Sequence, residues 1–233
     1  MSPRSNALLA DLPDAELAIL SPHLELVALH KGQTLFHAGE TPCHVYFPVG
    51  AIVSMMNDSE DGISTETVIF GKACMVGVGA LHQPSFYRAS VRSSGLAYRM
   101  PTHTFQALRS LCPTYGEKAM AAVHRMIMQL SLSVVCAKRH PIDQQLIRWM
   151  LVTLDRSSSD LIPITHQELS EILGFRREWV TVTLKKMSAR QDIALSRGSI
   201  EVLNRSALEE RSCDCYWVGQ QKSRPSWTAQ AAH

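Results

Sequence analysis

The chain has 233 residues, of which 45% are hydrophobic, and a formal net charge of only +2 at pH 7. This length allows one large domain or two ordinary ones, and the hydrophobic share is ample for a packed core. The small charge excludes a protein that binds polyanions through an overall basic surface, although the positive excess lies in the C-terminal third. We find no signal sequence and no uninterrupted apolar run of about 18 residues, so we expect a cytoplasmic chain that does not span a membrane.

The six cysteines are scattered without the spacing of a disulfide framework. In a reducing compartment each is expected to be a small buried hydrophobic residue. Cys213 and Cys215 stand two residues apart, so they would not face each other on a helix, but on an extended segment they could share a ligand. A thiol or metal sensor at this pair is one alternative function. Otherwise the sequence predicts no metal site and no evident cofactor.

Residues 6–112 are predicted to form a β-roll domain. After a short capped helical stretch at residues 11–20, the sequence from Leu24 to Met100 consists of short strand-forming runs. Turn sequences such as KGQ, GETPC, NDSEDG and SSG separate these runs at intervals of about ten residues. Such spacing favours an antiparallel roll or barrel.

Residues 113–139 are predicted to form one long helix. Residues 114–139 contain no proline and, after Gly116, no glycine, and they are rich in the strong helix formers Ala, Met and Leu. A second apolar strip, Ala119, Ala122, Met126 and Val135, could pack on the roll. Another set of apolar residues has heptad spacing and could pair with the same helix of a second copy of the chain. The residues of this dimer seam are Met120, Val123, Ile127, Leu130 and Val134. The alternative is a core helix of a single domain.

Residues 140–211 are predicted to form a winged helix-turn-helix domain. In ITHQELSEILGFRREWVTVTLKKM, residues 164–187, Thr165 and Glu168 have the spacing of a capping box, and Gly174 can turn the chain with a positive φ. Apolar residues repeat at helical spacing on both sides of this glycine, and the second helix has a basic outer face. Two strand-like runs around Arg197 and Gly198 predict a hairpin wing. Residues 218–233 are polar and are expected to be a disordered tail.

In this order, a β-roll, a seam helix and a winged helix-turn-helix resemble the Crp/Fnr superfamily of bacterial transcription regulators. The phrases KGQTLFHAGETPCHVYFPVGAIV and ITHQELSEILGFRREWV carry the resemblance, which covers nearly the whole chain. It implies an α+β fold made of a cyclic-nucleotide-binding-like antiparallel β-roll, a long dimerisation helix and a C-terminal winged helix-turn-helix. It also implies hairpin turns at Gly32, Gly39 and Gly50.

The function that the resemblance implies is that of a homodimeric regulator under the control of an unknown signal at the β-roll. Its recognition helices would enter the major groove of a near-palindromic site in double-stranded DNA. RNA polymerase would be a further partner.

The same resemblance, with the chemistry of the side chains, indicates the DNA contacts. The residues expected to contact bases are Arg177, Glu178, Arg176 and Thr181. The residues expected to contact phosphates are Thr165, His166, Gln167, Lys185 and Arg197. Two positions depart from the family pattern. Val182 stands where a third, basic reader is often found, and Arg176 stands where a Ser or Asp cap is usual. We expect a DNA phosphate at this uncapped helix end.

Cyclic AMP is expected not to bind. Nucleotide-sensing members use a Gly-Glu-Leu phrase followed by Arg-Ser or Arg-Thr. Here the sequence GKACMVGVG, residues 71–79, has Met75 and Val76 where the acid would be, and neither Ser nor Thr directly follows Arg88. An unmatched buried ribose hydroxyl would cost about 1–3 kcal/mol.

No nucleophile elbow, P-loop or HExxH motif is present, so we do not expect an enzyme. The main alternative to a DNA-binding regulator is a β-roll module that acts by protein contact. In that case the basic helix would be only a solvated face, and the capping box, Gly174 and the hairpin wing would not be required.

Overall fold

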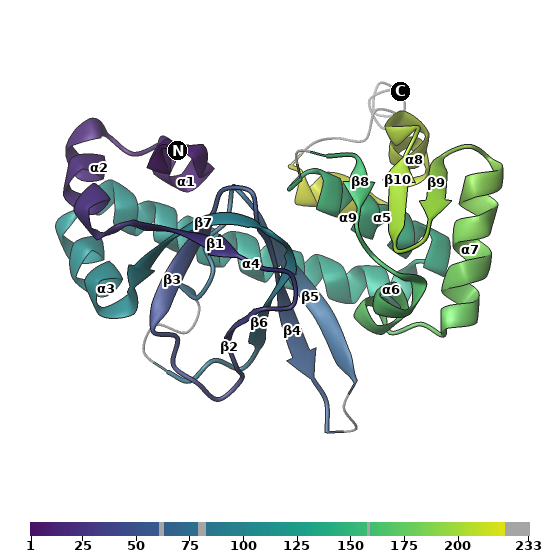
Figure 1. Ribbon diagram of the computed structural model, residues 1–233, viewed down its shortest axis with the longest axis horizontal. Helices are drawn as coiled ribbons and strands as arrows, with labels where there is room; N and C mark the ends of the chain where they lie inside the picture. The colour runs from purple at the N-terminus through teal and green to yellow at the C-terminus, as the bar shows by residue number, and fades with distance from the viewer. Residues whose placement is uncertain (61–62, 79–82, 158, 222–233) are drawn as a thin grey trace, which may run out of the picture. The chain divides into compact units, whose positions relative to one another are not determined.

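The computed structural model describes residues 1–60, 63–78, 83–157 and 159–221 (Figure 1). Among the predicted features, residues 61–62 of the NDSEDG turn, Gly79 of the GKACMVGVG phrase, Ser158 and residues 222–233 of the tail lie outside this set. The chain divides into two compact units between Ile127 and Met128.

The N-terminal unit is an antiparallel β-roll preceded by short helices. These helices are η1 (Pro3–Ser5), α1 (Ala7–Ala10), α2 (Asp14–Leu20) and η2 (Ser21–His23). The strands are β1 (Glu25–Leu29), β2 (Thr34–Phe36), β3 (His44–Pro48), β4 (Ile52–Asp58), β5 (Ser64–Phe70), β6 (Arg88–Ser93) and β7 (Gly95–Pro101). They form two antiparallel sheets with the orders β1-β7-β3 and β2-β6-β4-β5. The predicted roll is confirmed.

The three glycines expected at hairpin turns all lie between strands. Gly32 follows β1 and Gly39 follows β2, with φ of 86° and 85°, where a residue with a Cβ would be strained. Gly50, between β3 and β4, has no positive φ, and its backbone N–H donates to the carbonyl of Leu96 at 3.1 Å.

Helices α3 (Thr102–Leu111) and α4 (Pro113–Arg139) follow the roll. Phe105 of α3 is fully buried, and Tyr115, Ala119 and Ala122 of α4 join it in the core of the N-terminal unit. The ring centroids of Phe105 and Tyr115 lie 5.3 Å apart in an edge-to-face arrangement. Aromatic burial of this kind gives the core much of its packing energy.

The two predicted faces of α4 are largely present. Ala119, Ala122 and Met126 of the second strip are buried as expected. Val135 was also predicted for that strip, but it is exposed, because Cys136 is the residue that turns into the interior at that level. The seam residues Met120, Ile127 and Val134 are 64%, 53% and 56% exposed, and Val123 and Leu130 are half-buried.

Helix α4 is also the one helix in the described part of the chain that is long and apolar enough to cross a membrane. Polar residues such as Gln129 and Ser131 interrupt its apolar sequence, so it contains no uninterrupted apolar run of about 18 residues. Length and composition are weak evidence here, since the core helix of a soluble protein meets the same criterion.

The C-terminal unit has the predicted winged helix-turn-helix. Its elements are α5 (Ile142–Leu154), β8 (Leu161–Ile162), α6 (His166–Leu173), α7 (Arg177–Ala189), β9 (Ile193–Ser196), β10 (Ser199–Val202), α8 (Arg205–Arg211) and α9 (Asp214–Gly219). The sheet has the order β8-β10-β9. The sequence did not predict β8, α8 or α9. The disordered tail was expected from Val218, but Val218 and Gly219 belong to α9, whose neighbouring residues Tyr216 and Trp217 are buried.

Candidate nucleic-acid interface

The start of α6 is held by the predicted capping box. The backbone N–H of Thr165 donates to Oε2 of Glu168 at 2.7 Å, and the backbone N–H of Glu168 donates to Oγ1 of Thr165 at 3.1 Å. Two backbone donors that would otherwise lack partners are thus satisfied. His166 and Gln167, in the first turn of α6, are therefore held in a defined position.

The turn between α6 and α7 depends on Gly174, which has φ of 70°. The backbone N–H of the next residue, Phe175, donates to the carbonyl of Ser170 at 3.0 Å and closes the end of α6. Across the turn, Val180 and Leu184 of α7 are fully buried and pack the helix against its unit. This packing leaves the opposite face of α7 in solvent.

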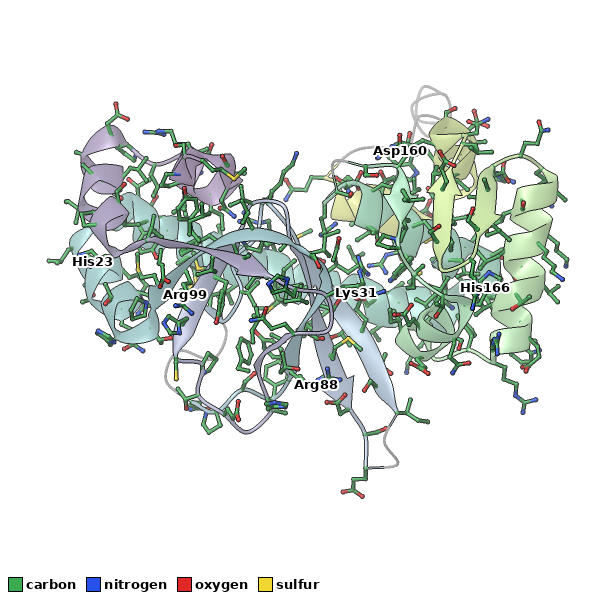
Figure 2. All side chains as sticks on the ribbon, viewed as in Figure 1. His23, Lys31, Arg88, Arg99, Asp160 and His166 are labelled. Atoms are coloured by element: carbon green, nitrogen blue, oxygen red, sulfur yellow. The ribbon has the colours of Figure 1, made fainter. Side chains whose placement is uncertain are left out.

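The exposed face of α7 carries Arg177, Glu178 and Lys185. His166 lies beside this face (Figure 2), and its ring Nδ1 is 3.1 Å from Oγ1 of Thr181. Burial, together with the positive charges of Arg177 and Lys185, lowers the pKa of His166. The structure thus brings together five residues for which the sequence predicted DNA contacts.

The N-terminal end of α7 has no side-chain cap. Arg176 is the N-cap residue and makes no side-chain capping hydrogen bond, as expected. Its guanidinium carbon instead lies 5.8 Å from the centroid of the Trp179 ring, within the range of a cation–π contact. The sequence analysis missed Trp179, which is 56% exposed. The signal for it was the spacing of an arginine and a tryptophan three residues apart on a helix.

Two other predicted phosphate contacts have different surroundings. The side-chain amide of Gln167 donates to Oε1 of Glu171 at 2.7 Å, so part of its donor capacity is used along α6. Arg197 is exposed at the wing turn, where Gly198 has φ of 79°.

Val182 stands where other family members often have a third, basic residue that contacts bases, and it is 52% exposed on α7.

In the β-roll, the described residues at the positions that bind cyclic AMP in other members are either buried and apolar or already paired. Met75 and Val76 are buried, and Val76 exchanges two backbone hydrogen bonds with Tyr46 at 2.8 and 3.0 Å. Arg88 (Figure 2) donates to both carboxylate oxygens of Asp58 at 2.8 and 2.9 Å. This hydrogen bonding from Arg88 lowers the pKa of Asp58 to about 2.

Two family models match the chain in the order that the fold shows. A cyclic nucleotide-binding domain matches residues 26–111, and a Crp-like helix-turn-helix domain matches residues 144–211. The chain belongs to the Crp/Fnr superfamily. Its members are transcription regulators, so this Crp/Fnr chain is a DNA-binding transcription regulator and not an enzyme.

Individual relatives of this Crp/Fnr protein are distant. The global nitrogen regulator of Synechococcus elongatus is 21% identical over 200 residues, which cover 81% of this chain and 90% of the relative. The structure of FixK2 from Bradyrhizobium japonicum superposes with a TM-score of 0.69 at 13% identity and covers 82% of this chain and 98% of its own. A Crp/Fnr-family structure from Eubacterium rectale has a TM-score of 0.67 at 17% identity, covering 88% of this chain and 97% of its own. At these identities the two structures establish the fold alone.

Proposed function

We propose that this regulator acts as a homodimer that reads a near-palindromic operator, with α7 of each subunit in a major groove. The observation that carries the proposal is the basic, solvent-facing side of α7, on which Arg177 and Glu178 occupy the first turn. Two such helices would enter successive grooves about 34 Å apart. The exposed apolar seam of α4, described above, supports pairing with a second copy, because burying it would remove large aliphatic side chains from water.

The base contacts are proposed to come from the start of α7. Arg177 has the forked donors that match guanine, and Glu178 can accept a hydrogen bond from the amino group of cytosine. Arg176 stacks on Trp179 and lies at the same helix end, where it can assist. Thr181 is proposed to act partly through His166, because its hydroxyl is in contact with that ring.

Phosphate contacts are proposed to set the register of the protein on the duplex. Lys185 is exposed on α7, and His166 contacts Thr181 of that helix. Thr165 and Gln167 are exposed at the start of α6, and Arg197 is exposed at the wing turn. The uncapped N-terminus of α7 would bind a further phosphate, because its free N–H groups and the helix dipole both favour an anion.

The signal at the β-roll is proposed not to be cyclic AMP. A ribose hydroxyl placed against Met75 and Val76 would meet buried apolar side chains instead of a carboxylate. The guanidinium of Arg88 is already paired with Asp58. RNA polymerase is the proposed protein partner once the dimer is on its operator.

Light scattering combined with a DNA-shift assay tests this proposal. The expected result is a dimer that shifts duplex DNA at low salt, and more strongly when the DNA holds a palindromic site selected from a random pool. A monomer that shifts no duplex would overturn the proposal and favour a β-roll module that acts by protein contact. Arg176→Ser tests separately whether the uncapped N-terminus of α7 binds a phosphate. If this variant keeps the DNA affinity and salt dependence of the wild type, position 176 has no role in phosphate binding.

A further inference from the structure

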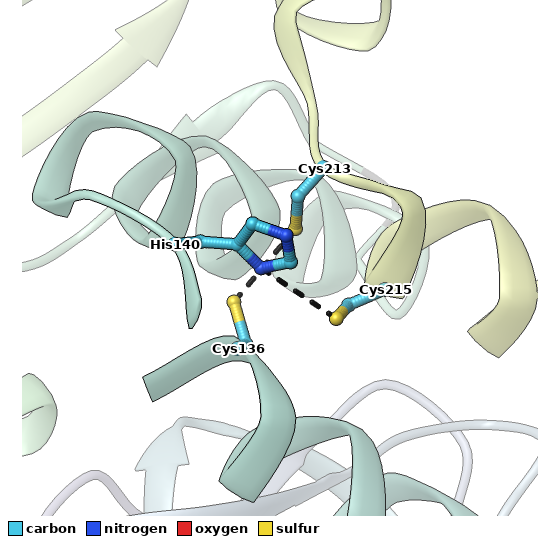
Figure 3. Close-up of side chains that lie close together, drawn as sticks. All are labelled: Cys136, His140, Cys213 and Cys215. Carbon is cyan, nitrogen blue, oxygen red and sulfur yellow. Dashed lines mark hydrogen bonds between the residues drawn. The ribbon is translucent and has the colours of Figure 1, made fainter. Parts of the chain in front are cut away.

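Four metal-ligating side chains meet inside the C-terminal unit, and Figure 3 shows them converging on one point. They come from the end of α4 and the residue after it, and from the start of α9 and its N-cap residue. They are Cys136, His140, Cys213 and Cys215, and their ligating atoms all lie within 4.8 Å of one another. The three cysteines are buried and His140 is half-buried. We propose that these three sulfurs and one imidazole nitrogen bind a zinc ion.

The local backbone explains why these residues converge. Cys136 lies in the last turn of α4, and His140 directly follows the helix. The backbone N–H of His140 still donates to the carbonyl of Cys136 at 3.1 Å, which keeps the two residues one helical turn apart. Cys213 is the extended N-cap residue of α9, whereas Cys215 lies in its first turn. The backbone changes direction between these two cysteines, so both sulfurs can face the same point. This is why the pair shares a site although residues i and i+2 of a regular helix do not.

The separations match the edges of a zinc coordination tetrahedron. Zinc binds sulfur at about 2.3 Å and nitrogen at about 2.0–2.1 Å, so tetrahedral ligands lie roughly 3.5–3.8 Å apart. The Sγ atoms of Cys136 and Cys213 are 3.7 Å apart, and Sγ of Cys215 is 3.7 Å from Nδ1 of His140. Two opposite edges of the tetrahedron are therefore already at the required length. The longest edge needs to close by about 1 Å, which side-chain rotation can supply.

The electrostatic surroundings also suit three thiolates around a divalent ion. Such a site carries one net negative charge, and the guanidinium of Arg148 on α5 interacts with all three cysteines. Arg148 is kept near α4 by a 3.4 Å hydrogen bond to the hydroxyl of Ser133. A metal ligand must be deprotonated, and a nearby cation favours that form.

Other uses of the same residues fit the geometry less well. A disulfide between Cys136 and Cys213 needs the sulfurs to approach to about 2.05 Å, and it gives no role to His140 or Cys215. An iron–sulfur cluster spreads its protein ligands over two or more iron atoms, so ligands of different irons stand farther apart than ligands of one ion. Three soft sulfurs and one imidazole in a tetrahedral arrangement are typical of zinc.

The proposed ion would fasten α9 to the end of α4. Helix α9 has only six residues, which is too short to be stable alone, and it packs against α5 of the helix-turn-helix domain. Zinc bound at this site would add four coordinate bonds to the buried cluster that Cys136, Cys213 and Cys215 already form. The proposal concerns metal content and stands apart from the DNA-reading roles given above.

Metal analysis of the full-length chain purified under reducing conditions tests the proposal. The expected result is one zinc ion per chain by mass spectrometry. After removal of zinc with a chelator, Co²⁺ should restore occupancy and give the visible d–d bands of a tetrahedral site, together with thiolate-to-cobalt charge transfer. The cobalt spectrum reports on the natural ligands, so this readout does not depend on variants that fail to fold.

Variants identify the ligands. C136S and C213S should each lose the stoichiometric metal, whereas C43S, which removes an exposed cysteine outside the cluster, should keep it. A reduced, folded chain that takes up neither Zn²⁺ nor Co²⁺ would overturn the proposal. So would metal retained by both C136S and C213S, or a chain that binds iron and sulfide instead. A Cys136–Cys213 disulfide in a chain that takes no metal when reduced would replace the zinc site with a thiol switch.

Discussion

The β-roll and the DNA-binding unit of this protein differ in how much of the family's chemistry each retains. In the roll, the positions of the nucleotide-binding phrase hold the buried Met75 and Val76, and Arg88 is paired with Asp58. In the DNA-binding unit, the capping box, the turn at Gly174 and the charged start of α7 are all present. The fold of the roll is therefore kept with buried apolar residues, Met75 and Val76, at the positions where a carboxylate was expected.

This difference indicates where a signal can act. A β-roll is held together by antiparallel pairing and an apolar core, neither of which depends on a carboxylate in the ligand pocket. The roll can thus lose nucleotide recognition without losing its structure. The helix-turn-helix cannot lose its basic face without losing its affinity for DNA. If the zinc site proposed above is confirmed, the metal-binding chemistry of this chain lies in its C-terminal unit.

The largest expected effect is a loss of stability on substitution of Met75 in the β-roll. Met75→Glu places a carboxyl group where 99% of the residue surface is removed from solvent, and an unmatched buried polar group costs roughly 2–7 kcal/mol. We expect the midpoint of urea unfolding to fall accordingly, with no binding of cyclic AMP by calorimetry. Met75→Leu, which keeps the volume, should cost less than about 1.5 kcal/mol. A stable Met75→Glu chain that binds cyclic AMP would mean that the roll retains a nucleotide pocket.

The next largest effect is a loss of DNA affinity on substitution of charged residues on the exposed face of α7. Arg177→Ala should cost about 1–3 kcal/mol of DNA-binding free energy and relax specificity at one base pair. Lys185→Ala should weaken binding to all sequences alike and reduce the salt slope by about 1. Binding isotherms on operator and random DNA over a range of salt would measure both.

Lys72→Ala is the matched control for these variants, because it removes an exposed positive charge from the other unit. It should leave the binding of either DNA unchanged. Equal losses on operator and random DNA for both Arg177→Ala and Lys185→Ala would contradict the division into base and phosphate contacts.

Most of the fold was predictable because its signals are local. Thr165 and Glu168 are three residues apart, and this spacing alone predicts the capping box that begins α6. A glycine readily adopts a positive φ, so Gly174 predicts the turn that ends the helix. The short runs between turns likewise indicated every strand of the roll. Helix α9 was not predicted, because its six residues gain stability from packing on α5 rather than from their own pattern.

The cysteine cluster could not be predicted as a site because it joins distant parts of the chain. Cys136 and Cys213 are 77 residues apart in the sequence, and nothing local indicates that α9 returns to the end of α4. One half of the signal was visible, since Cys136 and His140 have the i, i+4 spacing of ligands on one helix face. Treating each cysteine as a buried hydrophobic residue was correct for four of the six and missed the convergence of the sulfurs. It was wrong for Cys43, which is exposed, and for Cys74, which is half-buried.

A smaller effect is expected from a substitution in the capping box that begins α6. Thr165→Ala removes the hydroxyl that accepts the backbone N–H of Glu168, and loss of such a cap costs about 0.5–2 kcal/mol of stability. Thermal unfolding followed by circular dichroism would measure this loss. Thr165→Ser keeps the hydroxyl and should restore most of both stability and DNA affinity. If Thr165→Ser is as unstable as Thr165→Ala, the cap is not what the hydroxyl provides.

The smallest expected effect is a dependence of DNA affinity on pH, which tests whether His166 contacts a phosphate. Burial and the neighbouring Arg177 and Lys185 lower the pKa of His166 in the free protein. A DNA phosphate beside the ring would favour the charged imidazolium and raise that pKa, so binding would be accompanied by proton uptake. Affinity should therefore increase as the pH falls through the interval between the DNA-bound and the free pKa. For one proton per subunit, the change should be at most about tenfold per pH unit for each subunit, and thus about a hundredfold for the dimer.

His166→Gln keeps a polar side chain of similar reach and cannot titrate, so it should flatten the dependence of affinity on pH between the two values. Fluorescence anisotropy of labelled operator DNA at constant ionic strength would measure it. His124→Gln, which changes an exposed histidine of α4, is the control and should keep the wild-type slope. A slope that survives in His166→Gln would assign the proton to another group and leave His166 as the hydrogen-bonding partner of Thr181, with no contact to phosphate.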